Sequence, residues 1–210
     1  MSETTTLLFD FDAALEHLRA ENVCGFPTDT VFGLGGRADS SRALNSLFEL
    51  KKRQKSRAIV ALCADLAMAQ TLVEFSPTAH ELTRFWPGGL TLVLPRKPDA
   101  AIAPEAYAGL DSLGVRVPDL QLVVELIRAL GVPLATTSAN ISGTRTLSSA
   151  YEIANGFDMP VPVLEHDTAP SGQASTILKV QGEQVVVLRK GSLSTQEIEA
   201  TLNIQIKNPN

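Results

Sequence analysis

Threonine hydroxyls and glycines follow a short apolar run near the start of the chain. Residues 23–26 predict a buried strand, and residues 27–36 (PTDTVFGLGG) then supply two threonines and three glycines. Ligands of α/β proteins bind where strands end, and glycines let a ligand approach the backbone closely. The segment has neither a dinucleotide fingerprint nor a phosphate-binding P-loop. On its own it fits a tight turn capped by threonine or aspartate better than a binding site.

A dense group of cations interrupts a chain whose net charge is −5. The group connects a predicted amphipathic helix, 41–50, to a predicted buried strand, 58–64. A run of like charges is usually a solvated surface. A short connection between two buried elements also brings cations together, and guanidinium forks with lysine point charges suit a polyphosphate. The cations are Lys51, Lys52, Arg53, Lys55 and Arg57.

A single arginine alternates with valines in a third segment. Arg116 stands between Val115 and Val117 in a predicted strand over 113–117. Such a side chain lies either on the solvated face of an edge strand or in a site, where its fork suits a carboxylate. This segment alone leaves both alternatives open.

Hydroxyl and amide groups follow a further apolar strand, predicted over 133–137. Residues 136–143 (TTSANISG) combine threonine and serine hydroxyls with the amide of Asn140. These groups can bind a polar ligand through many donors and acceptors, and they can equally form a capped turn. Ser175 and Arg189, at the two ends of a predicted hairpin, are unremarkable when taken singly.

Helical and strand patterns alternate along the chain and then give way to a hairpin. This order predicts an α/β fold with a mixed sheet in one domain, covered on both faces. Helix signals include Asp12 as an N-cap, Gly131 as a stop and Ser194 as an N-cap in capping-box register with Glu197. We expect helices over 12–20, 41–50, 66–75, 77–85, 119–130, 148–155 and 194–202. We expect strands over 23–26, 58–64, 90–94, 113–117, 133–137, 161–164, 176–180 and 185–188, the last two joined through Gly182.

The composition is that of a globular protein. Of the 210 residues, 44% are hydrophobic, which is too many for a disordered chain. No apolar run approaches the roughly 20 residues that span a bilayer. Residues 1–4 carry no basic segment before the apolar residues 7–9, so we expect no secretory leader. Cys24 and Cys63 lie in apolar stretches and are expected to be buried thiols of a cytoplasmic protein, and no zinc-type spacing occurs.

Taken together, these segments resemble the YrdC-like threonylcarbamoyl-AMP synthases. They occur in the family's order and extend from about residue 10 to about residue 195. Seven ordered segments are far more specific than any one of them, and they outweigh the structural interpretations given above. The matching stretches are FPTDTVFGLG, the K-x-R of residues 51–53, FWPGGLT at 85–91, VRVP at 115–118, TTSANISG, STI at 175–177 and VLRKG at 187–191.

The resemblance implies a single α/β domain over residues 7–203, with a twisted mixed sheet, flanking helices and a large concave basic cavity. It implies a nucleotidyltransferase that joins L-threonine, bicarbonate or CO₂, and ATP into threonylcarbamoyl-adenylate and pyrophosphate. A separate tRNA threonylcarbamoyl-transferase complex would then modify adenosine beside the anticodon. The chain resembles the short form of the family, without the additional C-terminal domain of longer synthases.

The resemblance also assigns roles to individual residues. The residues expected to hold L-threonine are Thr30, Arg116, Thr136 and Ser175. Those expected to hold ATP are Arg53, Arg57, Ser112, Ser138, Thr146 and Arg189. The expected catalytic group beside the phosphates is Lys51, Arg53, Ser138 and Asn140. Mg²⁺ is expected to arrive with ATP, carried by phosphates and water, with no metal ligands from the protein.

Several departures from the family pattern leave alternatives open. Gln54 and Ala58 replace prolines of the phosphate loop, and Leu120-Gln121 replaces His-Pro. A YciO-type paralogue with another or a weak activity is therefore the first alternative. A non-catalytic RNA-binding module is the second, although the negative net charge and the scarcity of aromatic residues disfavour it. Weak contact with tRNA beside catalysis stays open, and no membrane partner is expected.

Overall fold

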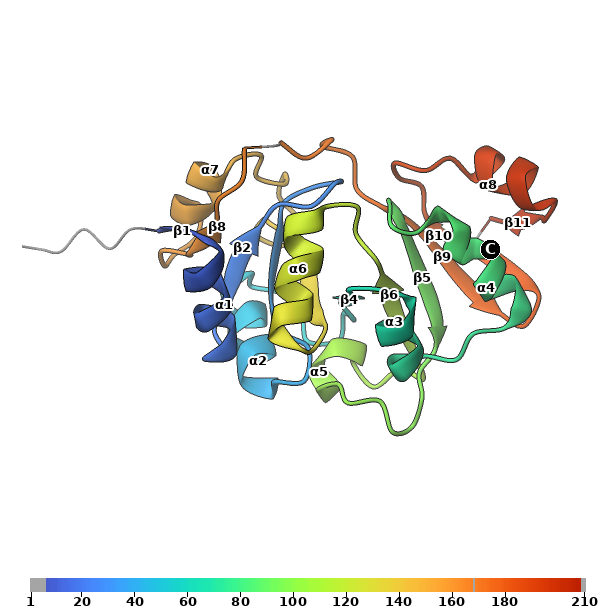
Figure 1. The fold of residues 1–210 in the computed structure, drawn as a ribbon, viewed down its shortest axis with the longest axis horizontal. Helices are drawn as coiled ribbons and strands as arrows, with labels where there is room; N and C mark the ends of the chain where they lie inside the picture. Colours follow the sequence, from blue (N-terminus) through green and yellow to red (C-terminus); the bar gives the residue numbers. More distant parts are fainter. Residues whose placement is uncertain (1–6, 168, 209–210) are drawn as a thin grey trace, which may run out of the picture.

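One mixed sheet runs through the whole protein (Figure 1). The structure is a computed structural model that describes residues 7–167 and 169–208. Within them the sheet has eleven strands in the order β1-β8-β2-β3-β7-β4-β6-β5-β9-β10-β11. The strands are β1 Leu8–Phe9, β2 Cys24–Phe26, β3 Gly33–Arg37, β4 Val60–Leu62, β5 Leu90–Pro95, β6 Ser112–Arg116, β7 Leu134–Ser138, β8 Val163–Leu164, β9 Thr176–Gln181, β10 Gln184–Arg189 and β11 Ile206–Lys207.

Parallel and antiparallel pairs alternate through the middle of this sheet. β4 and β6 are parallel, as are β5 and β9. β3 with β7, β4 with β7, and β5 with β6 are antiparallel. β9 and β10 form the predicted hairpin, in which Gly182 takes a positive φ. The predicted α/β fold with a mixed sheet is therefore confirmed.

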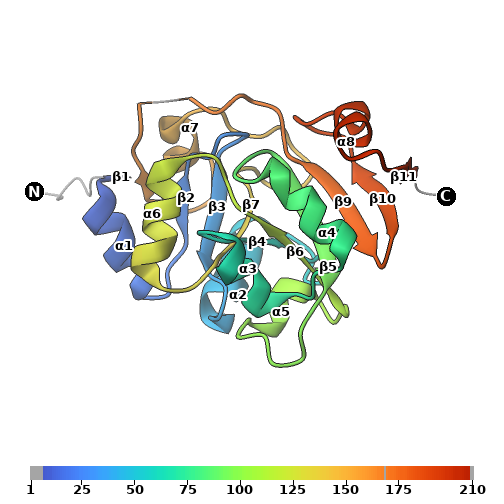
Figure 2. The same ribbon diagram turned by 45° about the vertical axis from the view of Figure 1, so that its right-hand side comes forward.

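Helices pack against both faces of the sheet (Figure 2). On one face α1 and α6 lie together and bury Leu18 and Ile127 with Phe26 of β2. On the other, α2 buries Leu44 and Phe48 in a second apolar cluster. The helices are α1 Phe11–Arg19, α2 Ser41–Leu50, α3 Leu66–Leu72, α4 Pro77–Leu82 with the 3₁₀ turn Thr83–Phe85, α5 Pro104–Tyr107, α6 Gln121–Leu130, α7 Ala150–Asn155 and α8 Thr195–Leu202.

Helix ends follow from capping groups in the sequence. Ser194 accepts from the Glu197 amide at 3.1 Å, and Gly131 ends α6 at φ +76°, as predicted. The prediction of Asp12 as the first cap is wrong. Asp10 caps α1, because its Oδ1 accepts from the Ala13 amide at 2.9 Å. Asp12 lies instead in the first turn, where a carboxylate favours the positive end of the helix dipole.

The glycine-rich segment predicted as a turn contains a central strand. β3 covers Gly33–Arg37 and pairs with both β2 and β7. Glycine is rare in strands, so the pattern suggested a turn. Here the missing side chains make room for a neighbour. A Cβ on Gly33 would lie 3.0 Å from the Phe26 ring, and a Cβ on Gly35 would lie 2.5 Å from the Ala135 carbonyl. The close approach of these strands requires glycine.

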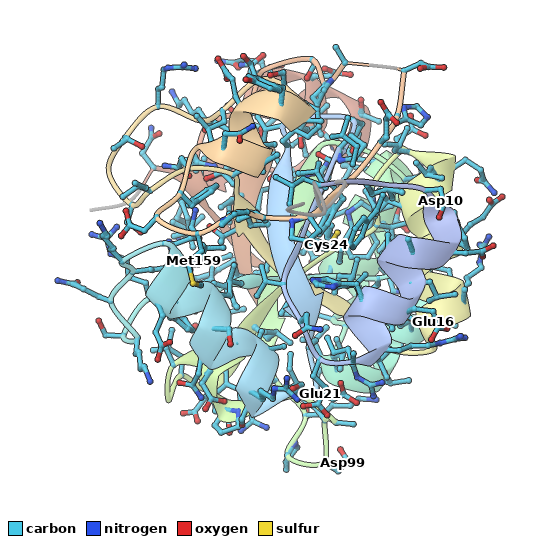
Figure 3. The ribbon with its side chains drawn as sticks, turned by 90° about the vertical axis from the view of Figure 1, so that its left-hand side faces the viewer. Asp10, Glu16, Glu21, Cys24, Asp99 and Met159 are labelled. Atoms are coloured by element: carbon cyan, nitrogen blue, oxygen red, sulfur yellow. The ribbon has the colours of Figure 1, made fainter. Side chains whose placement is uncertain are left out.

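Both cysteines are buried free thiols, as predicted. Figure 3 shows Cys24 in the interior, with Asp10 and Glu16 on the outside of α1. Burial raises the pKa of Cys24 to about 12 and raises that of Cys63 as well. Both thiols therefore stay protonated and unreactive at neutral pH.

Two expected absences concern the residues that the structure describes. Over 7–167 and 169–208, no three His, Cys, Asp or Glu side chains gather as a metal site would require. No helix of the same ranges combines the length and the apolar character needed to cross a bilayer. Residues 1–4, on which the expectation about a secretory leader rests, lie outside the described residues.

Replacing Gly35 with alanine tests the close packing of β3. In Gly35→Ala the new Cβ meets the Ala135 carbonyl, and backbone must move. We expect a loss of about 1–3 kcal/mol in the free energy of unfolding, measured by urea titration. Gly114→Ala is the control, because its Cβ would find ordinary contacts of 3.5–3.7 Å. Equal stability of the two variants would contradict the packing argument.

Candidate functional site

Strands from the middle of the sheet line one polar cavity of about 230 Å³. It is called the polar cavity below. Seven of the twelve predicted site residues line it: Thr30, Arg53, Arg116, Thr136, Ser138, Ser175 and Arg189. Apolar side chains complete the lining, among them Phe32, Ile59, Leu62 and Ile177. The structure thus brings together residues separated by up to 159 positions, since Thr30 and Arg189 share this cavity.

Arg116 lies at the centre of the site. Its strand, β6, runs between β4 and β5, and its side chain is buried with the residue only 5% exposed. The alternative of a solvated edge-strand arginine is therefore wrong. Its guanidinium donates to Gly88 O at 2.8 Å, to Thr30 Oγ1 at 2.8 Å and to Asp29 Oδ1 at 2.6 Å.

These contacts leave part of the Arg116 guanidinium free for a ligand. Arginine has five N–H donors, and three bonds use three of them. Burial lowers the pKa of Arg116, whereas the Asp29 carboxylate raises it. The ion pair offsets desolvation, and two N–H groups stay available for an anion such as a carboxylate.

Thr30 is held from two sides. Its hydroxyl lies 3.0 Å from Thr28 Oγ1, and Thr28 in turn donates to Val31 O at 2.6 Å. The segment before β9 also contacts Thr30, because the Gly172 amide donates to Thr30 O at 2.8 Å. Ser171 donates to the same carbonyl at 3.2 Å. Thr30 is therefore fixed by local turn contacts and by a distant segment.

Arg189 and Ser175 form a second fixed pair that lines the polar cavity. Arg189 donates through Nε to Ser175 O and through Nη2 to Ser175 Oγ, both at 3.0 Å. Thr91 Oγ1 lies 2.8 Å from the same Ser175 oxygen. Burial lowers the pKa of Arg189. Thr91 was not among the predicted site residues.

Lys51 holds the end of β7 and the residues that follow it. The Lys51 ammonium donates to the carbonyls of Ser138 and Asn140 and, at 3.2 Å, to Asn140 Oδ1. Asn140 Oδ1 also accepts from Ser138 Oγ at 2.7 Å. Lys51 is 1% exposed and does not line the polar cavity. In this structure Lys51 therefore fixes the segment that carries Ser138.

Arg53 carries unsatisfied donors at the rim of the polar cavity. Its Nη2 donates to Ala58 O at 2.9 Å, and its buried Nε has no partner among the described residues. Burial lowers the pKa of Arg53, and the charge of Arg57 lowers it further. A half-buried cation whose buried Nε has no partner is costly. An anion bound beside Arg53 would pair with its charge and accept from its unsatisfied N–H group.

Five predicted residues lie outside the polar cavity. Lys51 is below the β7 segment, and Asn140 is bonded to it. Ser112 opens β6, four residues from Arg116 and on the same sheet face. Thr146 lines a small adjoining cavity of about 100 Å³ that shares Val31 and Phe32 with the polar cavity. Arg57 is exposed in the turn that follows Arg53. The ligand roles of all twelve residues stay predictions.

Sequence reasoning missed part of the polar cavity. It did not assign Thr91 or the apolar lining, including Phe32 and Ile177, to the site. Thr91 ends the stretch FWPGGLT, which carried the resemblance without a role for any single residue. Apolar residues that border a ligand read as core in a sequence, because periodicity alone does not separate the two.

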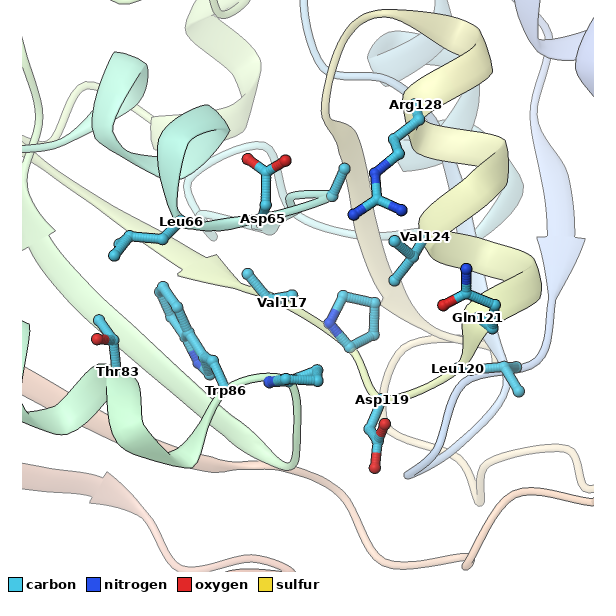
Figure 4. A pocket seen from close by; sticks show the side chains of 13 residues that line it. Asp65, Leu66, Thr83, Trp86, Val117, Asp119, Leu120, Gln121, Val124 and Arg128 are labelled. Atoms are coloured by element: carbon cyan, nitrogen blue, oxygen red, sulfur yellow. The ribbon is translucent and has the colours of Figure 1, made fainter.

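A second cavity, of about 390 Å³, lies at the start of α6 (Figure 4). Trp86 and Val124 border it, with Asp65 and Arg128 above. None of the twelve predicted site residues lines this cavity. The polar cavity is therefore the candidate site, although it is the smaller of the two.

The fold and the polar cavity define an α/β protein that directs guanidinium groups and hydroxyls at one ligand. A family model for Sua5/YciO/YrdC, described as telomere recombination, matches residues 16–191. Threonylcarbamoyl-AMP synthase of Bacillus subtilis (strain 168) is 36% identical over 188 residues, 88% of this chain and 54% of that protein. The synthase of Serratia proteamaculans (strain 568) is 34% identical over 190 residues, 88% of this chain and 97% of that protein. The chain belongs to the Sua5/YciO/YrdC family.

Solved structures share the fold. Pyrococcus abyssi Sua5 complexed with L-threonine matches with a TM-score of 0.85 and 32% identity, over 93% of this chain and 58% of that one. Escherichia coli YciO matches with a TM-score of 0.79 over 89% of this chain and 91% of that one. Its identity of 22% shows the fold alone. The chain spans about half the length of the B. subtilis relative.

The burial of Lys51 predicts a pH-dependent stability. Burial, and then the charge of Arg53, lower the pKa of Lys51 from 10.5 to about 7. The unfolded chain restores the ordinary pKa, so between pH 7 and 10.5 the unfolded state binds more protons. Stability therefore rises with pH in this window, by at most about 1.4 kcal/mol per pH unit, and the burial penalty is complete below it.

Lys51→Met isolates this effect. We expect the stability of the natural chain, measured by urea unfolding relative to Lys51→Met, to rise steadily from pH 7 to pH 9.5. Lys52→Met, at an exposed neighbour, is the control and should show no such trend. A flat difference for Lys51→Met would mean that the three oxygen acceptors keep the ammonium charged throughout.

Proposed function

We propose that the chain is a threonylcarbamoyl-AMP synthase that uses L-threonine, bicarbonate or CO₂, and ATP. One observation carries the proposal: among the described residues Arg116 keeps two N–H donors without a partner, in a cavity that Thr30, Thr136, Ser175 and the cations Arg53 and Arg189 also line. The names of the relatives support the synthase over the YciO-type alternative.

The amino acid occupies the side of the polar cavity near Arg116. The two free N–H groups of Arg116 bind the α-carboxylate, a bidentate role that suits arginine and that lysine copies poorly. Thr30 and Thr136 contact the remaining polar groups of threonine, and Ser175 lies beside the same site. The structure of P. abyssi Sua5 complexed with L-threonine supports this choice of amino acid.

ATP occupies the cationic side. Arg53 supplies its unsatisfied donors to the phosphates, with Ser138, Arg57 and Arg189 nearby and Thr146 in the adjoining cavity. Ser112, on the same face of β6 as Arg116, lies where an elongated nucleotide can extend. No carboxylate lines the polar cavity among the described residues. This donor set fits Mg²⁺ that is carried by phosphates and water rather than by protein ligands.

The reaction needs positioning more than proton transfer by the protein. The threonine amine adds to CO₂ with loss of a proton, or to bicarbonate with loss of water, and gives a carbamate. A carbamate oxygen then attacks the α-phosphorus in line, forming a new P–O bond while the bond to pyrophosphate breaks. Arg53 stabilises the leaving pyrophosphate, and Lys51 with Asn140 keeps Ser138 in place. No Ser-His-Asp or Cys-His arrangement is required.

The product has a place in tRNA modification. An acyl-adenylate is an activated donor, so the threonylcarbamoyl group passes to adenosine beside the anticodon through a separate transferase complex. Unpaired cysteines suit the reducing cytoplasm, where tRNA is modified. Weak RNA contact would come from the exposed cations of 51–57 and would weaken steeply with salt.

Pyrophosphate release tests the proposed activity. With ATP and Mg²⁺, we expect release that requires both L-threonine and bicarbonate and that falls when L-serine replaces L-threonine. The control omits each substrate in turn. Absence of release from a folded protein that still binds ATP or RNA would favour the paralogue or the RNA-binding module.

Two arginine variants test the division of the polar cavity. Arg53→Ala should raise the KM for ATP about 10- to 100-fold, because a charged hydrogen-bond partner is lost. Arg116→Ala should raise the KM for L-threonine by a similar factor. Arg84→Ala removes an exposed arginine that pairs with Glu81 and should leave both constants unchanged. The assignment is wrong if either site variant keeps wild-type kinetics.

A further inference from the structure

Thr91 is a buried polar residue that the proposed reaction does not yet use. It is 1% exposed and lines the polar cavity from β5. The register of β5 with β6 pairs Leu92 with Val115, so the next pair outward is Thr91 with Arg116, on one sheet face. On its other side β9 brings Ser175 within 2.8 Å of Thr91 Oγ1. Thr91 therefore lies between two residues of the proposed threonine site.

Either hydroxyl can donate in the Thr91–Ser175 bond, and the difference in burial favours Thr91 as the donor. A hydroxyl has one proton and two lone pairs. Among the described residues, Thr91 Oγ1 contacts Ser175 Oγ alone. Either direction leaves one hydroxyl proton without an acceptor in the described part of the protein. Thr91, at 1% exposed, is buried more deeply than Ser175, at 5%, so the direction in which Thr91 donates and the Ser175 proton faces the cavity is the less costly one. Ser175 Oγ also accepts from Arg189. Both lone pairs of Ser175 are then occupied, and its own proton is free to point into the polar cavity.

Two other hydroxyls of the proposed threonine site, those of Thr136 and Thr30, differ from that of Ser175. Thr136 donates to Leu34 O at 3.0 Å. Thr30 accepts from Arg116, and Thr28 donates to Val31 O and so does not donate to Thr30. Thr30 and Thr136 therefore each keep a lone pair for a ligand, whereas Ser175 offers a proton.

We propose that Thr91 is a positioning residue that makes Ser175 a hydrogen-bond donor for the substrate carboxylate. The proposal rests on the proposed function. Arg116 and Ser175 then supply donors to the carboxylate, and Thr30 and Thr136 accept from the amine and the hydroxyl of the amino acid. This polarity orients an L-amino acid that carries a donor on its side chain, and it holds the amine through neutral oxygens, which leave it free to become the carbamate nitrogen.

A pair of Thr91 variants tests this role. Thr91→Val keeps the shape and removes the donor, so one lone pair of Ser175 loses its partner and the Ser175 proton is no longer fixed toward the carboxylate. Thr91→Ser keeps the donor and removes a methyl group. We expect Thr91→Val to weaken L-threonine binding about tenfold in calorimetry. We expect the same factor in the KM for L-threonine, an unchanged KM for ATP, and wild-type values for Thr91→Ser.

The outcomes separate this inference from the proposed function. Equal L-threonine affinity of Thr91→Val and the natural chain would overturn the role of Thr91, whatever the activity. A rise of both KM values in Thr91→Val and Thr91→Ser alike would assign Thr91 to packing and would also overturn it. Failure of the natural chain to release pyrophosphate would overturn the proposed function instead. Thermal unfolding of both variants checks that they fold.

Discussion

The burial of the Arg116 guanidinium is the constraint around which the site is built. A cation inside a sheet loses its hydration, and only paired charges and hydrogen bonds offset that loss. Asp29, Gly88 O and Thr30 supply the partners, from two segments that are distant in sequence. The same partners fix the guanidinium in one orientation. Because they use three of its five donors, two N–H groups are left for a ligand. The need to satisfy a buried charge thus produces a specific binding group.

The opposite side of the polar cavity is left incomplete by the protein itself. Within the part of the chain that the structure describes, Arg53 keeps a buried N–H without a partner, and Arg57 stands close enough to lower the pKa of Arg53 further. Binding sites retain such unsatisfied donors because a ligand completes them. Arg116, where the amino acid is proposed to bind, is therefore paired with the Asp29 carboxylate. Arg53, where phosphates are proposed to bind, has no carboxylate partner among the described residues. The Arg116 side and the Arg53 side of the polar cavity differ in whether their arginine has a counterion more than in the types of residue that they contain.

Backbone segments with no regular structure are made rigid by a few buried side chains. Lys51 holds the segment after β7 through two carbonyls and the Asn140 side chain. Arg189 and Thr91 hold Ser175. Positioning of this kind suits chemistry in which substrates carry most of the reactive groups, because catalysis then depends on alignment and charge. It also explains why several residues of the resemblance lie behind the polar cavity and not in it.

Local signals in the sequence determined most of the fold's elements. Serine caps, Gly131 and apolar periodicity act within a few residues, so most helices and most central strands were predicted, with errors at their ends, whereas β3 and α5 were not. Seven cavity residues were named because their motifs were recognised in order.

The tertiary structure alone decided which groups meet. Thr91 and Ser175 are 84 positions apart in the sequence, and Arg116 and Thr30 are 86 positions apart. Sheet order and register set such contacts, and one sequence without its fold does not specify them. The glycines of β3 show the same limit, because the Phe26 ring and the Ala135 carbonyl that require them lie on neighbouring strands.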